Sequence, residues 1–544
     1  MYVYTALIFA AILGAVYTLD KTKIVATKQG RVEGSLAVNE LYYEYLGIRY
    51  GIPVKFRAPE EPPTFDEIYK ADNRAVLCPQ FPCHDPLAAP SDNEDCLVLN
   101  IYTPSSTVNF TLPVIVFLHG GDFGVGSGSP SFYGPQYLVS HGVVLVTVNY
   151  RLNAYGFLNL GTVDAPGNAG LKDIRAALRW IKENIRGFNG DPDNVTVLGQ
   201  GSGGTAAVYL TLSDSTKGLF HRIISESGAL FSPKSFDPNP LKTASQVAKS
   251  LGVKTLDPDK LLKIYSETAI NVVEEAISKQ MHAKNVFAPT VENIFDEEEA
   301  FLTDTPYNIL ANKKFNPVPA IFGLNTVEGL TSTLDYNTIT SQIDRLKHED
   351  YSVLDQRSFA VPSEDIEEFR TTLQETYFSD TSSEETIIGG IINFNTDFNY
   401  VGPMSLLTEM YANNSGLPLF EFIFNYTGSR NIGRMLTNSS LLVTTNQDEL
   451  FYVFELERLP LPMDENDARM VTFMTMMWTN FAKYGTPTPE RGNGEWLPCP
   501  HHLAISLEPQ YVAPLTPDRA YFWRSLYLEY GAEIDFGGNV DISS

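Results

Sequence analysis

The chain has 544 residues, of which 43% are hydrophobic, 12% aromatic and 19% charged. This composition is ample for a large buried core and differs from that of a disordered chain. The net charge of −26, with only 39 basic residues, argues against nucleic acid or an anionic membrane surface as a partner. Solubility of a secreted protein is the simpler explanation of this acidity.

The N-terminus has the pattern of a secretory signal peptide. Residues 1–17 form an apolar run that ends before Asp20 and Lys21, and it is short for a membrane span. The run has no Lys or Arg before it. We expect a signal peptide over residues 1–18, with cleavage between Ala15 and Thr18. No second hydrophobic stretch predicts a membrane span, so the sequence predicts a secreted, extracellular protein over residues 19–544.

Glycosylation sequons and cysteines agree with secretion. The sequons lie at Asn109, Asn194, Asn413, Asn425 and Asn438. We predict glycosylation at all of them except Asn194, which begins a predicted buried strand. The four cysteines are Cys78, Cys83, Cys96 and Cys499. In an oxidising compartment they can form disulfides, and their spacing alone leaves three full pairings open.

Short apolar runs alternate with segments of helical spacing along the chain. Strands are predicted at Val114–Leu118, Val143–Val148, Val195–Leu198, Arg222–Ser225 and Val318–Gly323. Helices are predicted at Leu171–Ile185, Thr205–Leu212, Met470–Tyr484 and Tyr521–Tyr530. This order predicts an α/β fold with a large, mostly parallel central sheet covered by helices on both faces. No repeat, low-complexity tract or linker divides residues 19–544, so a single domain is expected.

An ordered set of motifs resembles a known family. They are Asn93-Glu-Asp-Cys-Leu-Val-Leu-Asn-Ile-Tyr102, His119-Gly-Gly-Asp-Phe123, Asn149-Tyr-Arg-Leu152, Gly167-Asn-Ala-Gly-Leu171, Asn194-Val-Thr-Val-Leu-Gly-Gln-Gly-Ser-Gly-Gly204, Leu219-Phe-His-Arg222 and Trp478-Thr-Asn-Phe-Ala482. From about residue 25 to 530 the chain resembles the type-B carboxylesterase and cholinesterase family, which has the α/β-hydrolase fold. The resemblance implies a Cys78–Cys96 disulfide, while Cys83 and Cys499 either pair or remain free.

The nucleophile expected from this resemblance is missing. An α/β-hydrolase carries its serine at the centre of G-x-S-x-G, on a sharp turn between a strand and a helix. Here the pattern is Gly199-Gln-Gly-Ser-Gly203, so the resemblance places Gly201 at the serine position. Ser202 is one residue further along. Its use would rotate the following helix by about 100°, and we interpret it as a helix-start residue.

The base is missing as well, although the acid is present. Gly323-Leu-Asn-Thr-Val-Glu-Gly-Leu330 resembles the segment that carries the family's triad carboxylate, which implies Glu328. Asn446-Gln-Asp-Glu-Leu-Phe-Tyr-Val-Phe454 resembles the segment of the triad histidine, so the base position is Asn446. An amide cannot take a proton near neutral pH, whereas imidazole can. Residues 349–500 contain no histidine that could replace it.

The oxyanion hole is the third element. The resemblance places it at Gly120, Gly121 and Asp122, together with Ser202 beyond the elbow. A carboxylate at Asp122 would oppose the developing negative charge if it faced the site. It would be harmless if it turned outward, and the sequence leaves both alternatives open.

These departures predict a non-catalytic member of an enzyme family. Loss of the serine or histidine of such a triad costs on the order of 10⁶ in turnover, about 8 kcal/mol. We expect a secreted protein that binds or sequesters a small hydrophobic ligand, such as an ester, in the remaining active-site gorge. An extracellular protein–protein interaction module is the first alternative, and weak ester hydrolysis through Ser202 or a water on Glu328 is the second. No metal or cofactor is expected.

Overall fold

The computed structural model describes most of the chain between residues 21 and 531. The described ranges are 21–39, 41–81, 89–106, 110–281, 287–333, 336–348, 359, 361–437, 442–489 and 495–531. The predicted signal peptide, Cys83 and the sequons at Asn109 and Asn438 lie outside these ranges.

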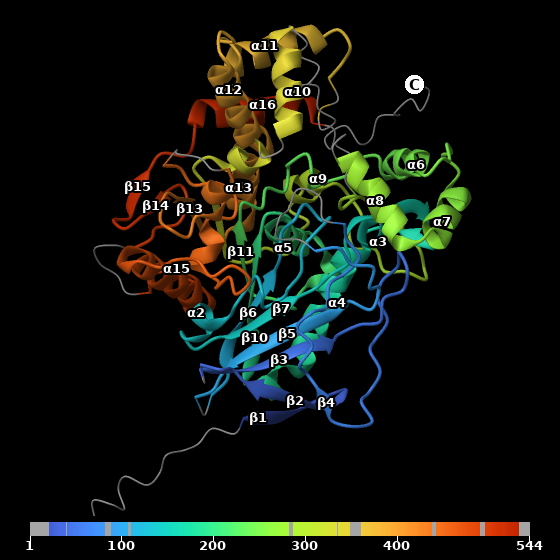
Figure 1. The fold of residues 1–544 in the computed structure, drawn as a ribbon, viewed down its shortest axis with the longest axis vertical. Helices are drawn as coiled ribbons and strands as arrows, with labels where there is room; N and C mark the ends of the chain where they lie inside the picture. The colour runs from blue at the N-terminus through green and yellow to red at the C-terminus, as the bar shows by residue number, and fades with distance from the viewer. Residues whose placement is uncertain are drawn as a thin grey trace, which may run out of the picture.

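One sheet of 13 strands forms the centre of the molecule (Figure 1). Its middle strands are parallel and run in the order β7 (Val144–Val148), β6 (Leu112–Leu118), β10 (Gly190–Gln200), β11 (Arg222–Glu226), β12 (Ala320–Asn325), β13 (Leu419–Phe424) and β14 (His502–Ile505). Antiparallel strands flank them, namely β1 (Thr22–Thr27), β2 (Gly30–Leu36), β3 (Tyr42–Arg49) and β5 (Val98–Pro104) on one side and β15 (Gln510–Val512) on the other. The short β4 (Tyr69–Lys70) pairs with β2, and β8 (Asn159–Thr162) and β9 (Ala165–Pro166) form a separate pair.

Helices pack on both faces of this sheet and, as a separate group, at one end of the molecule. They are α2 (Gln136–Val139), α3 (Asn153–Phe157), α4 (Ala169–Asn184), α5 (Ser202–Leu212), α6 (Pro240–Ser250), α7 (Pro258–Glu267), α8 (Ile270–Met281), α9 (Pro306–Ala311), α10 (Tyr336–Lys347), α11 (Ile366–Tyr377), α12 (Glu384–Thr396), α13 (Gly402–Ser415), α14 (Ile432–Thr437), α15 (Glu465–Tyr484) and α16 (Pro517–Tyr530). Figure 1 shows α10, α11 and α12 stacked beside α16 at one end of the molecule.

The alternation of side chains along each strand divides the core into two layers. In β6, Val114, Val116 and Leu118 pack in the cluster that contains α4 and α5. Ile115 and Phe117 pack in the cluster that contains α2 and α15. Because every second residue of a strand points to the same face, a continuous apolar run fills both layers at once. The predicted fold class is therefore confirmed.

The predicted elements are present, with differences at their ends. β10 begins at Gly190 rather than Val195, because Gly190 pairs with Leu112 and an irregularity separates that pair from the one at Val195. α5 begins at Ser202, three residues before the predicted Thr205. The antiparallel strands at both edges and the helices from α6 to α13 were not predicted. Most of these helices lie outside the central alternation of strand and helix on which the prediction depended.

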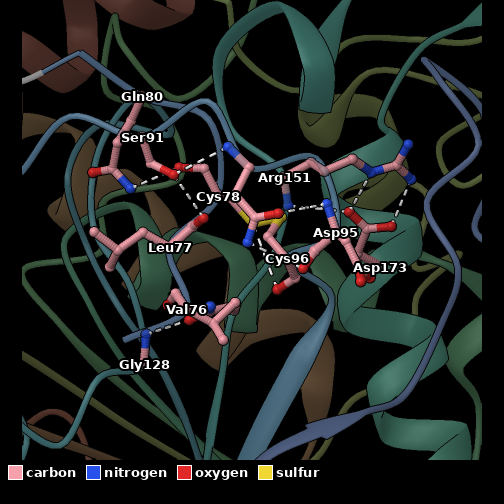
Figure 2. The surroundings of a disulfide bond; sticks show 12 residues. Val76, Leu77, Cys78, Gln80, Ser91, Asp95, Cys96, Gly128, Arg151 and Asp173 are labelled. Atoms are coloured by element: carbon pink, nitrogen blue, oxygen red, sulfur yellow. Dashed lines mark hydrogen bonds and ion pairs between the residues drawn. A yellow bond between two sulfur atoms is a disulfide. The ribbon is translucent and has the colours of Figure 1, made fainter. Parts of the chain in front are cut away.

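A disulfide joins Cys78 to Cys96 (Figure 2). Next to it, the Gln80 amide donates to the carbonyl of Gly126 at 2.9 Å and accepts from the Gly126 N–H at 2.9 Å. The disulfide therefore holds the segment that supports the loop after β6. Cys499 forms no disulfide with any described residue.

The three sequons within the described residues differ in the solvent exposure of their asparagine side chains. Asn413 and Asn425 are exposed. Asn194 lies inside β10, and its side-chain oxygen Oδ1 accepts a hydrogen bond from Arg222 Nη1 at 2.5 Å. The glycosylation of Asn413 and Asn425 stays a prediction, and the contact with Arg222 gives a physical reason for excluding Asn194.

A buried ion pair ties the loop after β7 to α4. Arg151 donates to both carboxylate oxygens of Asp173, from Nε at 2.7 Å and from Nη2 at 2.6 Å (Figure 2). Its remaining donors reach the carbonyls of Val54 and Arg57. Both side chains are almost fully buried. The guanidinium thereby connects the β3–β4 segment, the loop after β7 and α4 through a single charged group.

Replacement of Asp173 by alanine is expected to lower the free energy of unfolding by about 3–5 kcal/mol, because it leaves a buried guanidinium without its counter-charge. Urea unfolding followed by circular dichroism measures this loss. As a control, Asp193→Ala removes the exposed partner of Arg186 and should change stability little. An equal effect of the two substitutions would contradict the importance of the buried pair.

Candidate functional site

The strand-to-helix turn at the end of β10 is the centre of the site. β10 ends at Gln200, Gly201 follows, and α5 begins at Ser202. Gly201 has φ 54° and ψ −125°, a backbone conformation that glycine adopts far more readily than residues with a Cβ. The Gly201 N–H donates to the carbonyl of Glu226 at 2.8 Å, which fixes the turn against the end of β11.

The glycines around this turn differ in the space beside them. A Cβ at Gly199 would overlap the carbonyl of Gly203, and a Cβ at Gly203 would overlap the carbonyl of Leu118. A Cβ at Gly201 would have only one heavy atom within 4 Å, the Cα of Gly120 at 3.9 Å. Gly199 and Gly203 are thus required by close packing. Gly201 is required only by its backbone angles, and a side chain there would enter open space.

Ser202 is held within the scaffold. Its Oγ accepts a hydrogen bond from the N–H of Phe123 at 3.2 Å, and the residue is buried. The Tyr150 hydroxyl, which donates to the carbonyl of His119 at 2.7 Å, lies beside it. This placement agrees with the interpretation of Ser202 as a helix-start residue that joins α5 to the loop after β6.

The predicted oxyanion loop lies directly against the turn. A Cβ at Gly120 would come within 2.8 Å of both the carbonyl oxygen and the Oε1 of Gln200, so only glycine allows this approach. Gly121, Asp122 and Phe123 all have positive φ values, of 111°, 53° and 57°. The loop is a tight turn that faces the end of β10.

The Asp122 carboxylate has a counter-charge in Lys234. Its Oδ2 lies 2.5 Å from Nζ of Lys234, and the two side chains are 41% and 47% exposed. The carboxylate is therefore paired with a cation at a half-exposed position, and this pairing offsets part of its negative charge. The backbone N–H of Asp122 remains part of the loop.

The predicted acid and base positions meet in the structure. Asn446 Nδ2 donates to Oε2 of Glu328 at 2.9 Å, and Gln200 Nε2 donates to Oδ1 of Asn446 at 3.3 Å. The other carboxylate oxygen of Glu328 accepts from the Ser227 hydroxyl at 2.6 Å and from the N–H of Asn325 at 2.7 Å. Asn446 thus occupies the middle of a hydrogen-bonded relay from Gln200 to Glu328, with both ends of its amide paired.

Two further carboxyl groups are buried near Glu328, and sequence reasoning missed them. Glu226 at the end of β11 accepts from the indole N–H of Trp478 at 2.6 Å, and Glu449 accepts from Asn325 Nδ2 at 2.6 Å. Within the described part of the chain, Glu226 Oε2 and Glu449 Oε1 have no hydrogen-bond partner. The available signal was a carboxylate at the end of a buried strand, in Ser225-Glu-Ser227, where a solvated side chain is not expected.

Burial controls the protonation of this group. Desolvation raises the pKa of Glu226 to about 8. It also raises the pKa of Glu328, while the hydrogen bond from Ser227 lowers the pKa of Glu328 and offsets part of this effect. The pKa of Glu449 is raised mainly by burial and further by the charges of Glu226 and Glu328. Three carboxyls so close together in a desolvated site cannot all ionise without a large cost.

A small cavity of about 50 Å³ lies beside the loop after β6 and the end of β10. Its lining includes Gly120, Gly121 and Gln200 together with the aromatic residues Tyr133 and Phe451. Within the described ranges, no group of three or more His, Cys, Asp or Glu residues is arranged to hold a metal ion. None of the described helices is both long and apolar enough to cross a bilayer.

The parallel sheet, the strand-turn-helix elbow and the opposed glycine loop define an α/β-hydrolase of the esterase type. The chain belongs to the carboxylesterase family, whose model matches residues 21–523.

Comparison with individual proteins gives the same result. The chain is 31% identical to juvenile hormone esterase of Heliothis virescens, with 83% of each chain covered. It is 30% identical to bile salt-activated lipase of Mus musculus, over 91% of this chain and 82% of the lipase. The solved structure of juvenile hormone esterase from Manduca sexta, with OTFP covalently attached, superposes with a TM-score of 0.83 at 26% identity and covers 93% of this chain and 100% of that one.

The raised carboxyl pKa values predict that stability falls as pH rises. Between the unfolded pKa near 4.3 and a folded pKa of about 8 for Glu226, the folded state binds more protons than the unfolded state. The free energy of unfolding therefore decreases by about 1.4 kcal/mol per pH unit for each such group. Glu226→Gln removes one titrating group, so it should reduce this slope by about 1.4 kcal/mol per pH unit. The amide oxygen of the glutamine can still accept the hydrogen bond from Trp478.

Urea unfolding at intervals from pH 5 to 8 measures the slope for the wild type and for Glu226→Gln. The exposed Glu508 provides the control substitution Glu508→Gln, which should leave the slope unchanged. A wild-type stability that rises with pH across this range would show that the carboxyls are ionised in the folded protein.

Proposed function

We propose that this chain is a secreted, non-catalytic member of the carboxylesterase family that binds a small hydrophobic ester or similar molecule at the former active site. The observation that carries the proposal is the turn at Gly201. Its backbone has the conformation of a nucleophile elbow and leaves room for a side chain, yet the residue there has none. The turn therefore keeps the backbone geometry of a nucleophile elbow but lacks the hydroxyl group that would act as the nucleophile.

The relay at Asn446 supports the same conclusion. A triad histidine donates to the carboxylate through one nitrogen and accepts the serine proton at the other. Asn446 makes the first of these contacts, to Glu328, but its oxygen accepts from Gln200 and has no basicity near neutral pH. The position has kept its structural hydrogen bond and cannot move a proton.

Residual hydrolysis through Ser202 finds less support than binding. Its Oγ lies in the scaffold beside Phe123 and Tyr150. A serine nucleophile needs a base within hydrogen-bond reach. Among the described residues, the histidine of this region is His119. It is buried, desolvation lowers its pKa to about 4, and neither ring nitrogen is hydrogen-bonded to Ser202. Exposed Asn413 and Asn425 and the Cys78–Cys96 disulfide support secretion.

The wild-type protein is expected to give no fluorophosphonate adduct and no burst with p-nitrophenyl butyrate, because no activated nucleophile is present. Mass spectrometry of the labelled protein and stopped-flow absorbance check these two results. Pancreatic-type serine esterase run in parallel confirms that the probe is reactive. Stoichiometric labelling of Ser202 would overturn the proposal.

Restoration of the two positions together should create activity. Gly201→Ser places a hydroxyl in the open space at the turn, and Asn446→His places an imidazole beside Glu328. Since triad members act as a unit, each single variant should stay at the wild-type rate. The double variant should hydrolyse p-nitrophenyl butyrate on the order of 100-fold faster, although the strained backbone at position 201 costs about 1–3 kcal/mol. A double variant that folds but shows no gain would contradict the retained geometry.

Ligand binding is tested with the unhydrolysed ester itself. Gly201→Leu should fill the space above the turn and weaken binding of p-nitrophenyl butyrate at least about 10-fold in equilibrium dialysis. Gly201→Ser is the matched control, since it carries the same backbone strain and adds only a small side chain. Equal affinities of the wild type and Gly201→Leu would exclude this site as the binding site.

A further inference from the structure

The loop after β6 is held by a residue outside the elbow. The backbone N–H of Asn153, the first residue of α3, donates to the carbonyl of Phe123 at 2.8 Å. Its side-chain Nδ2 donates to the carbonyl of Gly124 at 2.9 Å. Phe123 in turn donates its N–H to Ser202 Oγ at the start of α5. Asn153 thus fixes two consecutive carbonyls of the loop that faces the turn.

These contacts hold a strained stretch of backbone. Asp122, Phe123 and Asn153 have positive φ values of 53°, 57° and 49°. Such conformations cost free energy in residues with a Cβ, and they persist where surrounding contacts hold them. Phe123 also packs against Phe157 of α3, with the ring centroids 5.0 Å apart. The shape of the loop therefore depends on its contacts with α3.

A buried glutamate on α8 completes this support. Glu274 Oε2 accepts from Asn153 Nδ2 at 2.7 Å, so one amide group bridges α8 and the loop. Figure 1 shows α8 beside α3, on the side of the molecule that also holds α6 and α7. Glu274 is 1% exposed, and its Oε1 has no hydrogen-bond partner among the described residues. A negative charge in such a place is strongly disfavoured.

The unpaired polar atoms around Glu274 are short of donors. Asn153 Oδ1 and the Tyr155 hydroxyl are also buried without partners in the described part of the chain. An amide oxygen and an ionised carboxylate can only accept, and a phenol donates once. A proton on Glu274 adds a second donor and removes the buried charge. Desolvation accordingly raises the pKa of Glu274 to about 8.

The charged and titratable groups nearby do not offset a charge on Glu274. On α3, burial and then the charge of Glu274 raise the pKa of the Tyr155 hydroxyl. Lys55 lies over the ring of Tyr155 and pairs with Glu94. Tyr265 of α7 donates its hydroxyl to a backbone carbonyl. The side chains that α6 buries, where it packs against α8, are uncharged. None of these described groups supplies a counter-charge to Glu274.

We propose that Glu274 is a positioning residue of the ligand site at the elbow, and that it supports the loop after β6 only as a neutral carboxylic acid. Neutral, it accepts from Asn153 and leaves no buried charge. Ionised, it draws water or other donors to Oε1, and the contact that Asn153 makes to Gly124 loosens. The loop is therefore held below a pH of about 8 and released above it. The support itself is independent of the function proposed above, whereas its effect on a ligand rests on that function.

Hydrogen–deuterium exchange of the ligand-free, full-length protein tests this support. The amides of Phe123, Gly124 and Val125 are hydrogen-bonded, so a peptide that covers the loop reports their opening. Glu274→Gln keeps an acceptor for Asn153 and cannot ionise. At pH 9 the wild-type loop should exchange at least about 10-fold faster than the loop of this variant, and the difference should shrink toward pH 6. Comparison at one pH removes the intrinsic pH dependence of exchange.

Glu275→Gln is the matched control, because Glu275 is the exposed neighbour on α8 and pairs with Lys279. It should leave the exchange of the loop unchanged at both pH values. Equal exchange of the wild type and Glu274→Gln at pH 9 would overturn the proposal. If Glu274→Gln fails to fold, Asn153→Gly decides the question, since glycine adopts this backbone readily and lacks the amide. Its loop should exchange faster than the wild-type loop at pH 6, and unchanged exchange would again contradict the proposal.

Binding of valerophenone, a ketone that water does not cleave, gives the separate ligand readout in equilibrium dialysis. The ratio of the wild-type dissociation constant to that of Glu274→Gln should rise about 10-fold from pH 7 to pH 9. The ratio removes the contribution of Glu226, whose pKa of about 8 lies in the same range. A constant ratio would show that Glu274 does not regulate the site. If neither protein binds the ketone while the loop exchanges as expected, the function proposed at the elbow fails and the support by Glu274 stands.

Discussion

The close contact between the end of β10 and the loop after β6 is the constraint on which the site depends. Gly120 lies against Gln200, and Gly203 lies against the carbonyl of Leu118, at distances that admit no Cβ. These approaches bring the first turn of α5 and the oxyanion loop together and fix the direction in which position 201 would project a side chain. Because the geometry is held by packed backbone rather than by the residue at the apex, replacement of that residue changes the chemistry and leaves the architecture in place.

The same separation of geometry from chemistry explains the polar network behind the turn. Glu328 accepts hydrogen bonds from Ser227, Asn325 and Asn446. An amide at position 446 satisfies this carboxylate as well as an imidazole would, and it does so without being able to change its charge. Gln200 completes the relay by donating to the amide oxygen. A buried donor that is lost from such a network leaves its acceptor unpaired at a cost of about 1–3 kcal/mol, which is a reason for the position to hold a hydrogen-bonding residue even without catalysis.

The central part of the fold could be predicted because its strands are buried on both faces and therefore read as short β-branched runs, as in Val144–Val148 and Leu112–Leu118. The turn at Gly201 could be predicted because the glycines at positions 199, 201 and 203 lie where close packing or a positive φ leaves no place for a Cβ. The outer antiparallel strands and the helices from α6 to α13 were harder to predict, because they do not follow the regular alternation of strand and helix along the chain.

The site was predictable only where a motif carried it. Gly201, Glu328 and Asn446 lie in recognisable segments, and the structure places them in one region. Glu226, Glu449 and Ser227 lie in segments whose spacing says nothing about which carboxyls converge, since residues more than a hundred positions apart meet only in the folded chain. The orientation of Asp122 depends on Lys234, a long-range partner that no local pattern identifies. Contacts of this kind are properties of the tertiary structure.

Energetics explain how a scaffold of this kind persists once catalysis is lost. A serine at φ 54° would carry about 1–3 kcal/mol of backbone strain that glycine does not, so its loss stabilises the turn. The buried carboxyls act in the opposite direction, because desolvation disfavours their ionised forms. They cannot be removed one at a time as easily, since Asn325 donates to Glu449 and Trp478 donates to Glu226, and each removal would leave a buried donor unpaired. The apex is therefore free to lose its side chain, while the acidic network beneath it is held by its own hydrogen bonds.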